Sequence, residues 1–196
     1  MAPFEYLIAF VSVVLALAIA HALSGLLKII EHRDSARIDW LPLLWTFSLL
    51  MWSVSFWWFT YGRAELPATE IHVLHLLYVL GYAATIYVSL GLLYPHRIAA
   101  GHDMRAHFER NRSWFFSALL VLGAFDIGDT LWAVVTYGGS PFRLYWFTAG
   151  VWLLGSAAAL RVENRRYHVA FAVVFAAAVT VLTVFDPSLE GVRTLG

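Results

Sequence analysis

Residues 40–62, WLPLLWTFSLLMWSVSFWWFTYG, form an unbroken apolar segment without a charged side chain. A helix of about 20 apolar residues crosses the roughly 30 Å hydrocarbon core of a bilayer, so this segment predicts a membrane span. Five other segments of the chain are almost as apolar. The six predicted spans are residues 5–27, 40–61, 69–94, 113–137, 142–160 and 167–185. The sequence therefore predicts an all-α integral membrane protein with one six-span domain over residues 1–196.

The composition agrees with a membrane protein and argues against several other classes. Hydrophobic residues make up 61% of the chain and charged residues 13%, whereas soluble domains carry about 25% charged residues. The formal net charge is zero, so we expect no basic surface for nucleic acid. Cysteine is absent, which rules out disulfides and thiolate metal sites. No basic residue precedes the first apolar segment, so we expect a retained span rather than a signal peptide.

The distribution of lysine and arginine predicts the orientation in the membrane. Of the 13 such residues, ten fall in the loops after the first, third and fifth predicted spans. The ten are Lys28, Arg33, Arg37, Arg97, Arg105, Arg110, Arg112, Arg161, Arg165 and Arg166. Cytoplasmic loops carry the excess of positive charge. We therefore expect a protein of a bacterial-type inner (plasma) membrane with both termini outside the cytoplasm.

The two halves of the predicted protein, three spans each, have opposite orientations in the membrane. Residues 12–27 and 117–132 align loosely, which places His21 opposite Asp126. Apolar segments align easily by chance, so a 3+3 inverted repeat and two unrelated halves are both open interpretations. An inverted repeat would favour a transporter or a channel, whose site often lies at the repeat interface near the middle of the bilayer.

Two carboxylates, Asp126 and Asp129, lie inside the fourth predicted span, in the stretch VLGAFDIGDTLW. Three residues apart, they share one helical face, and each costs about 2.5–3.5 kcal/mol at the centre of a bilayer. They should therefore face protein or water, and at least one should keep a proton at neutral pH. One hypothesis is a structural hydrogen-bond cluster. The other, which intramembrane carboxylates favour, is a pathway for protons or small cations.

Three histidines extend this pattern along the membrane normal. With a rise of about 1.5 Å per residue, His72, His75, Asp129, Asp126 and His21 lie about 4, 8, 12, 16 and 22 Å from the outer ends of their spans. Successive groups differ in depth by about 6 Å or less, a gap that one water or hydroxyl can bridge. If the first, third and fourth spans are in contact, these residues form an ion or proton path.

The start of the third span offers a weak candidate for a metal site. Glu70, His72 and His75 combine an HxxH spacing with a nearby carboxylate, but a fourth ligand is not evident. Haem between His21 and a second histidine is a further alternative, although the available partners lie at a different depth. We predict no cofactor, with metal and haem as open alternatives.

The second predicted span is rich in tryptophan. Trp45 and Trp52 are seven residues apart and fall on one helical face with Ser48. Tryptophan facing lipid or the membrane interface is the ordinary interpretation. The alternative is a pocket of Trp45, Trp52 and Ser48 for a flat or cationic ligand, because tryptophan faces attract cations.

The sequence contains no HExxH motif, glycine-rich phosphate loop or serine-nucleophile elbow, so we do not expect an enzyme. The leading expectation is a proton or small-cation channel or transporter. The alternatives are a ligand-binding membrane subunit or receptor, and a structural partner in a larger membrane complex. Small residues at Ala16, Ala20 and Ser24, and at Gly150 and Gly155, also predict a homo-oligomer.

Overall fold

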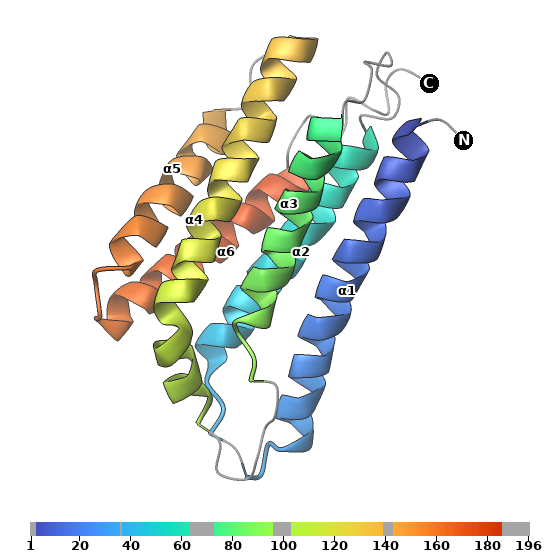
Figure 1. Cartoon of the computed structure of the whole chain (residues 1–196). Helices are drawn as coiled ribbons and strands as arrows, with labels where there is room; N and C mark the ends of the chain where they lie inside the picture. The colour runs from blue at the N-terminus through green and yellow to red at the C-terminus, as the bar shows by residue number, and fades with distance from the viewer. Residues whose placement is uncertain (1–2, 36, 63–72, 96–102, 139–142, 186–196) are drawn as a thin grey trace.

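The computed structural model describes residues 3–35, 37–62, 73–95, 103–138 and 143–185 (Figure 1). Six helices make up most of this part of the chain. They are α1 (Pro3–Glu31), α2 (Trp40–Gly62), α3 (Val73–Gly91), α4 (Met104–Tyr137), α5 (Arg143–Ala159) and α6 (Arg165–Phe185). The predicted all-α class is confirmed. All of these helices except α5, which has 17 residues, are long and apolar enough to cross a membrane.

The boundary that differs most from the predicted spans is the start of α4. This helix begins at Met104 rather than at residue 113, so part of the charged stretch expected as a loop is helical. Asp103 caps it by accepting hydrogen bonds from the backbone N–H groups of Arg105 and Ala106, at 2.9 and 3.1 Å. Arg105 then pairs with Glu109, one turn later, at 2.8 Å.

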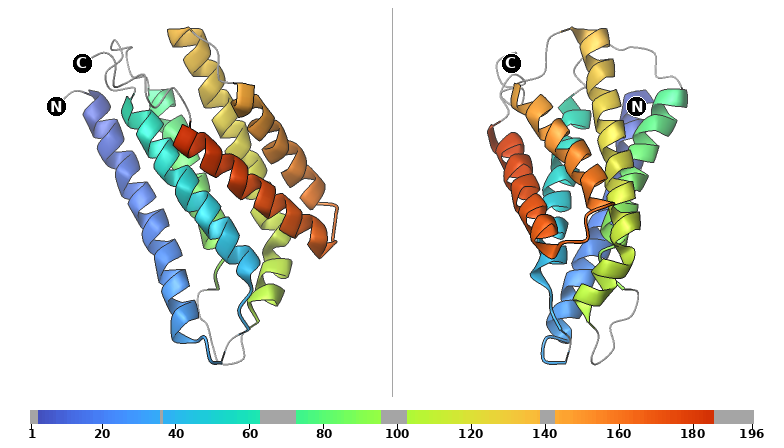
Figure 2. Two further views of the ribbon diagram at one scale, coloured as in Figure 1. Left: turned by 180° about the vertical axis from the view of Figure 1, so that it is seen from behind. Right: turned by 90° about the vertical axis from the view of Figure 1, so that its left-hand side faces the viewer.

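The helices form one bundle in which α1 packs chiefly on α3, α2 on α6 and α4 on α5. Helix α3 also contacts α4, so the pair α1–α3 is joined to the pair α4–α5. Figure 2 shows α6 running obliquely across the face that lies behind the view of Figure 1. No internal repeat is detected among the described helices. The main pairing also differs between the halves, α1 with α3 in the first and α4 with α5 in the second.

Aromatic side chains form the core between α2, α4 and α6. Trp45 is fully buried, and the rings of Phe115, Phe116, Phe171 and Phe175 surround it at centroid distances between 5.2 and 5.7 Å. Edge-on aromatic pairs contribute about 0.5–1.5 kcal/mol each beyond their buried area. Because lipid tails are as apolar as leucine, packing of this kind is what holds membrane helices together.

The outer surface of the bundle is strongly apolar. Leu74, Val135 and Leu154 are among its most exposed large side chains. Soluble monomers rarely expose large contiguous apolar patches. The exposed apolar side chains and the lengths of the helices together indicate a lipid bilayer as the environment.

Polar contacts connect the loops at the end of the bundle where α2, α4 and α6 begin, which we call the loop end. The backbone N–H of Met104 donates to the carbonyl of Arg37 at 3.1 Å. Asp39 forms a two-point ion pair with Arg165, at 2.7 and 2.9 Å, and also accepts the backbone N–H of Leu41 at 3.2 Å. Burial alone would raise the pKa of Asp39, but the hydrogen bonds from Arg165 and Leu41 outweigh it and hold this pKa below its usual value.

Candidate functional site

Asp126 is a buried acid in the apolar part of α4. Among the acidic side chains that the structure describes, only Asp39 and Asp126 are buried. Asp39 lies at the loop end of the bundle, whereas Asp126 lies about 16 Å along the helix axis from the last residue of α4. A carboxyl group at that depth is costly unless other protein groups bind it, so its neighbours determine what it can do.

Two tyrosines from different helices bind the Asp126 carboxyl group. The hydroxyl of Tyr82, on α3, donates to Oδ1 at 2.9 Å, and the hydroxyl of Tyr145, on α5, donates to Oδ2 at 2.8 Å. The Tyr82 hydroxyl in turn accepts the indole N–H of Trp52, on α2, at 3.0 Å. Each oxygen of the Asp126 carboxyl group therefore has a hydrogen-bond donor, and the network through Tyr82 and Tyr145 joins α2, α3, α4 and α5.

This arrangement suits a carboxyl group that changes its protonation state. Phenol donors to both oxygens stabilise the charged form, since hydrogen bonds to an ionised acceptor are stronger than neutral ones. A tyrosine hydroxyl is both a donor and an acceptor, so Tyr82 and Tyr145 can reorient when Asp126 gains or loses a proton. The carboxylate oxygens of Asp126 are also ligands of the kind that bind small hard cations.

Asp129 and His75 lie on the same side of the bundle, nearer the end of α4 that carries Tyr137. Asp129 is half-buried. The ring of His75, on α3, lies against Trp132, on α4, with centroids 4.7 Å apart. Tyr78, between His75 and Tyr82 on α3, donates its hydroxyl to the carbonyl of Phe125. Spacings of three and four residues place His75, Tyr78 and Tyr82 on one face of α3, toward α4.

His21 belongs to a different interface. Its ring lies 5.8 Å from that of Tyr87, and it approaches Gly91, so it packs between α1 and α3. Asp126 contacts α3 from the side of α4. The described contacts therefore place His75 and Asp126 along the α3–α4 interface and His21 along the α1–α3 interface. Glu70 and His72, the other candidates for a path or a metal site, lie outside the described residues.

The residues of the predicted tryptophan pocket lie in the core. Trp45 is enclosed by phenylalanine rings, and its indole N–H has no hydrogen-bond partner. Ser48 is buried and donates to the carbonyl of Leu44 at 2.8 Å. Trp52 meets Trp152 edge to face, with centroids 4.7 Å apart. A ligand pocket at these residues stays a prediction.

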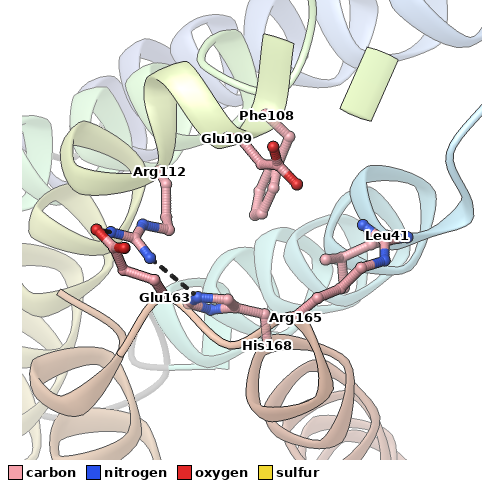
Figure 3. A pocket seen from close by; sticks show the side chains of 7 residues that line it. All are labelled: Leu41, Phe108, Glu109, Arg112, Glu163, Arg165 and His168. Atoms are coloured by element: carbon pink, nitrogen blue, oxygen red, sulfur yellow. Dashed lines mark hydrogen bonds and ion pairs between the residues drawn. The ribbon is translucent and has the colours of Figure 1, made fainter. Parts of the chain in front are cut away.

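A polar cavity lies at the end of the bundle where α2, α4 and α6 begin, opposite the end that carries Tyr137 (Figure 3). Its volume is about 280 Å³, and it is lined by Leu41, Phe108, Glu109, Arg112, Glu163, Arg165 and His168. This cavity could not be predicted from the sequence, because its residues come from α2, from α4 and from the start of α6 with the loop before it, which are far apart in the chain. The roles of Tyr82 and Tyr145 were not predicted either, since a tyrosine near a span end, as Tyr145 is, has the position of an interfacial anchor.

The chain matches no protein-family model, no curated protein and no solved structure. The class of the protein therefore follows from its own fold and residues. It is an α-helical multi-pass membrane protein with a buried carboxyl group at the centre of a hydrogen-bond network that joins four helices.

Proposed function

We propose that this protein moves or senses protons, or a small cation that uses the same groups, through the carboxyl group of Asp126. The observation that carries the proposal is the binding of this buried carboxyl by Tyr82 and Tyr145 at 2.9 and 2.8 Å. Structural carboxylates are found in membranes too, but intramembrane acids are commonly part of ion or proton pathways. The test is pH-dependent ion flux in proteoliposomes compared with that in empty liposomes.

The route from Asp126 toward the end of the bundle that carries Tyr137 is the better supported half. Asp129 lies one turn beyond Asp126, and His75 follows on the facing helix. A histidine ring has two nitrogens that can donate or accept a hydrogen bond, which is what a proton relay requires. These groups are candidates for the outer stations of the proposed path, with His72 next along the chain.

The other half of the route is filled by aromatic side chains. Trp152 is buried against α4 and donates its indole N–H to the carbonyl of Leu119 at 2.8 Å. Phe115 and Phe116 are fully buried on the next turn. This packing favours a protein that opens to one side at a time, as a transporter or a sensor does, over a continuously open channel. In this proposal His21 is an inner station only if α1 and α3 move.

The six helices are proposed to be six spans, with α5 crossing where the bilayer is thinned, because 17 residues reach about 26 Å. Both termini are proposed to lie outside the cytoplasm of an inner (plasma) membrane. The support is the concentration of lysine and arginine at one end of the helices, in and next to the connections from α1 to α2, α3 to α4 and α5 to α6.

A homo-oligomer is also part of the proposal. On α5, a side chain added at Gly155 would collide with Phe171, whereas one added at Gly150 would have no atom of the described part of the chain within 4 Å. The surface around Gly150 is therefore open to a helix of a second copy, since glycine allows helix backbones to approach closely. Native mass spectrometry in mild detergent should show more than the 22.1 kDa monomer, and a monomer at every concentration would contradict this.

A further inference from the structure

The polar cavity at the loop end has a charge arrangement that the proposed ion path does not use. Two of its charged residues already have close partners. Arg165 is held by Asp39 at 2.7 Å, and Glu109 is held by Arg105 at 2.8 Å. The cavity charges that remain are those of Arg112 and Glu163.

Arg112 and Glu163 are only loosely paired. Their closest atoms, Nη2 and Oε1, are 3.6 Å apart, which is too long for a hydrogen bond. The Arg112 side chain is 16% exposed, whereas that of Glu163 is 87% exposed. A strong pair would replace lost hydration with short contacts, and this one does not. Each group therefore retains capacity to bind an opposite charge from a ligand.

The protein holds the Arg112 guanidinium in place at the edge of the cavity. Its Nη1 donates to the carbonyl of Val162 at 2.8 Å and lies 3.4 Å from Nε2 of His168. Figure 3 shows the guanidinium, the Glu163 carboxylate and the His168 ring grouped on one side of the cavity. His168 is itself buried, and its Nδ1 has no hydrogen-bond partner. A fixed guanidinium is the side chain best suited to phosphate or carboxylate.

The cavity lies at the level expected for lipid head groups. It is next to the starts of α2 and α6, where the apolar part of each helix begins. Trp40, at the start of α2, and Trp114, half a turn beyond Arg112 on α4, are both exposed. Exposed tryptophans at the ends of apolar segments mark the membrane–water interface. Basic pockets between membrane helices on the cytoplasmic side, where the proposed orientation puts this end, are known sites for phospholipid head groups.

We propose that this cavity binds a zwitterionic head group that carries an anionic phosphate and a primary ammonium group. Arg112 binds the phosphate and Glu163 binds the ammonium, so the ligand replaces the loose contact between them with two close ones. The volume of about 280 Å³ is just below the usual range for small-molecule sites, which suits a head group rather than a larger ligand. Phosphatidylethanolamine is the membrane source of this chemistry, and phosphoethanolamine is the soluble one.

The test compares lipids that differ in one charged group. The full-length protein is reconstituted in vesicles of equal parts phosphatidylethanolamine, phosphatidylcholine and phosphatidylglycerol, and then extracted for native mass spectrometry. Phosphatidylcholine has no N–H donor for Glu163, and phosphatidylglycerol has no cation. We expect wild type to retain phosphatidylethanolamine over the other two by about tenfold, the value of one charge-assisted hydrogen bond.

Two variants and a control separate binding from folding. Arg112→Gln should lose the bound lipid, but it also removes the hydrogen bond to Val162, so loss of folding could produce the same result. Glu163→Gln changes an exposed side chain and should fold normally, yet it should lose the preference for phosphatidylethanolamine. Glu31→Gln, an identical change at an exposed position on α1, should bind as wild type does.

A parallel measurement identifies the source of the ligand. If soluble phosphoethanolamine raises the melting temperature of wild type but not of Glu163→Gln, and no lipid is retained, then the site takes the soluble form of the same zwitterion. The proposal is overturned if wild type retains the three lipids equally and phosphoethanolamine has no effect. It is also overturned if Glu163→Gln keeps the wild-type preference. None of these outcomes depends on ion flux.

Discussion

The hydroxyl of Tyr82 lies 2.9 Å from Oδ1 of Asp126, although the two residues are 44 positions apart in the chain. Tyr82 is also the acceptor for the indole N–H of Trp52. One hydroxyl therefore connects α2, α3 and α4 inside the apolar part of the bundle. The Tyr145 hydroxyl adds α5 from the other side of the carboxyl group.

This asymmetry predicts that the two tyrosines differ in their importance for stability. Tyr145→Phe removes a hydrogen bond to the carboxyl group, worth about 1.5–3 kcal/mol, and its bond with Thr130, whose half-buried hydroxyl can rotate to another acceptor. Tyr82→Phe removes an equivalent bond and also leaves the buried N–H of Trp52 without its acceptor, which costs about 1–3 kcal/mol more. Unfolding in increasing fractions of dodecyl sulfate should rank Tyr82→Phe as the less stable variant. Equal stabilities would contradict the chain from Trp52 to Asp126.

The ion pair between Asp39 and Arg165 predicts a pH dependence of stability. The pKa of Asp39 is lowered in the folded protein. Its contribution to the free energy of unfolding is therefore complete above about pH 4, the unfolded value, and is lost as the pH falls through the folded value. Asp39→Asn should lower stability by about 2 kcal/mol at pH 7, and this deficit should shrink in acid. Melting curves of both proteins from pH 7 to pH 3 check this.

Asp34→Asn is the control for that measurement. Asp34 lies in the same connection between α1 and α2, but its side chain is 89% exposed, and its Oδ1 is 3.9 Å from Nε of Arg33, too far for a hydrogen bond. The free energy of unfolding of Asp34→Asn should stay within about 0.5 kcal/mol of the wild-type value at every pH. If Asp34→Asn and Asp39→Asn behave alike, the ion pair with Arg165 does not stabilise the loop end of the bundle.

Two glycines on α5 predict opposite outcomes for the same substitution. Gly155→Ala places a methyl group against the ring of Phe171, and such overpacking costs about 1–3 kcal/mol. Gly150→Ala meets no atom of the described residues within 4 Å and should leave the monomer unchanged or up to about 1 kcal/mol more stable, since alanine favours a helix. Thermal melts at low protein concentration measure both. A loss of stability at Gly150 would contradict the packing of α5.

The topology can be tested with single cysteines, because the chain contains none. Cysteine at position 35, in the loop after α1, should be protected from an impermeant maleimide added to intact cells. Cysteine at position 188, beyond the described end of α6, should be labelled. Labelling after membrane disruption is the control for accessibility. The reverse pattern would contradict the proposed orientation.

The six helices could be predicted from the sequence because apolar length is a local property of the chain. The early start of α4 also has a local cause, the cap at Asp103, but the charges around it are equally typical of a loop. The partners of Asp126 could not be predicted in the same way. Tyr82 and Tyr145 lie in apolar segments where tyrosine has no distinctive spacing, and their meeting depends on how α3, α4 and α5 pack.

The same limit applies to the tryptophans and histidines. The spacing of Trp45 and Trp52 places them on one face of α2, but it does not say what covers that face. In the structure, aromatic side chains of α4 and α6 cover it around Trp45. The depths of His75 and His21 followed from helix geometry. Their separation onto two faces of α3 depended on the order of the helices around the bundle.

Asp126→Asn in proteoliposomes tests the central claim most directly. The oxygen of the side-chain amide can accept a hydrogen bond from one tyrosine hydroxyl, and its NH₂ group can donate one to the other. The variant should therefore fold, with a free energy of unfolding within about 1 kcal/mol of the wild-type value. With an internal pH dye and an imposed membrane potential, wild type should carry H⁺ or exchange it for another cation, and Asp126→Asn should fall to the level of empty liposomes. Wild-type flux no greater than that of empty liposomes, or full flux in Asp126→Asn, would contradict this claim and leave Asp126 with a structural role.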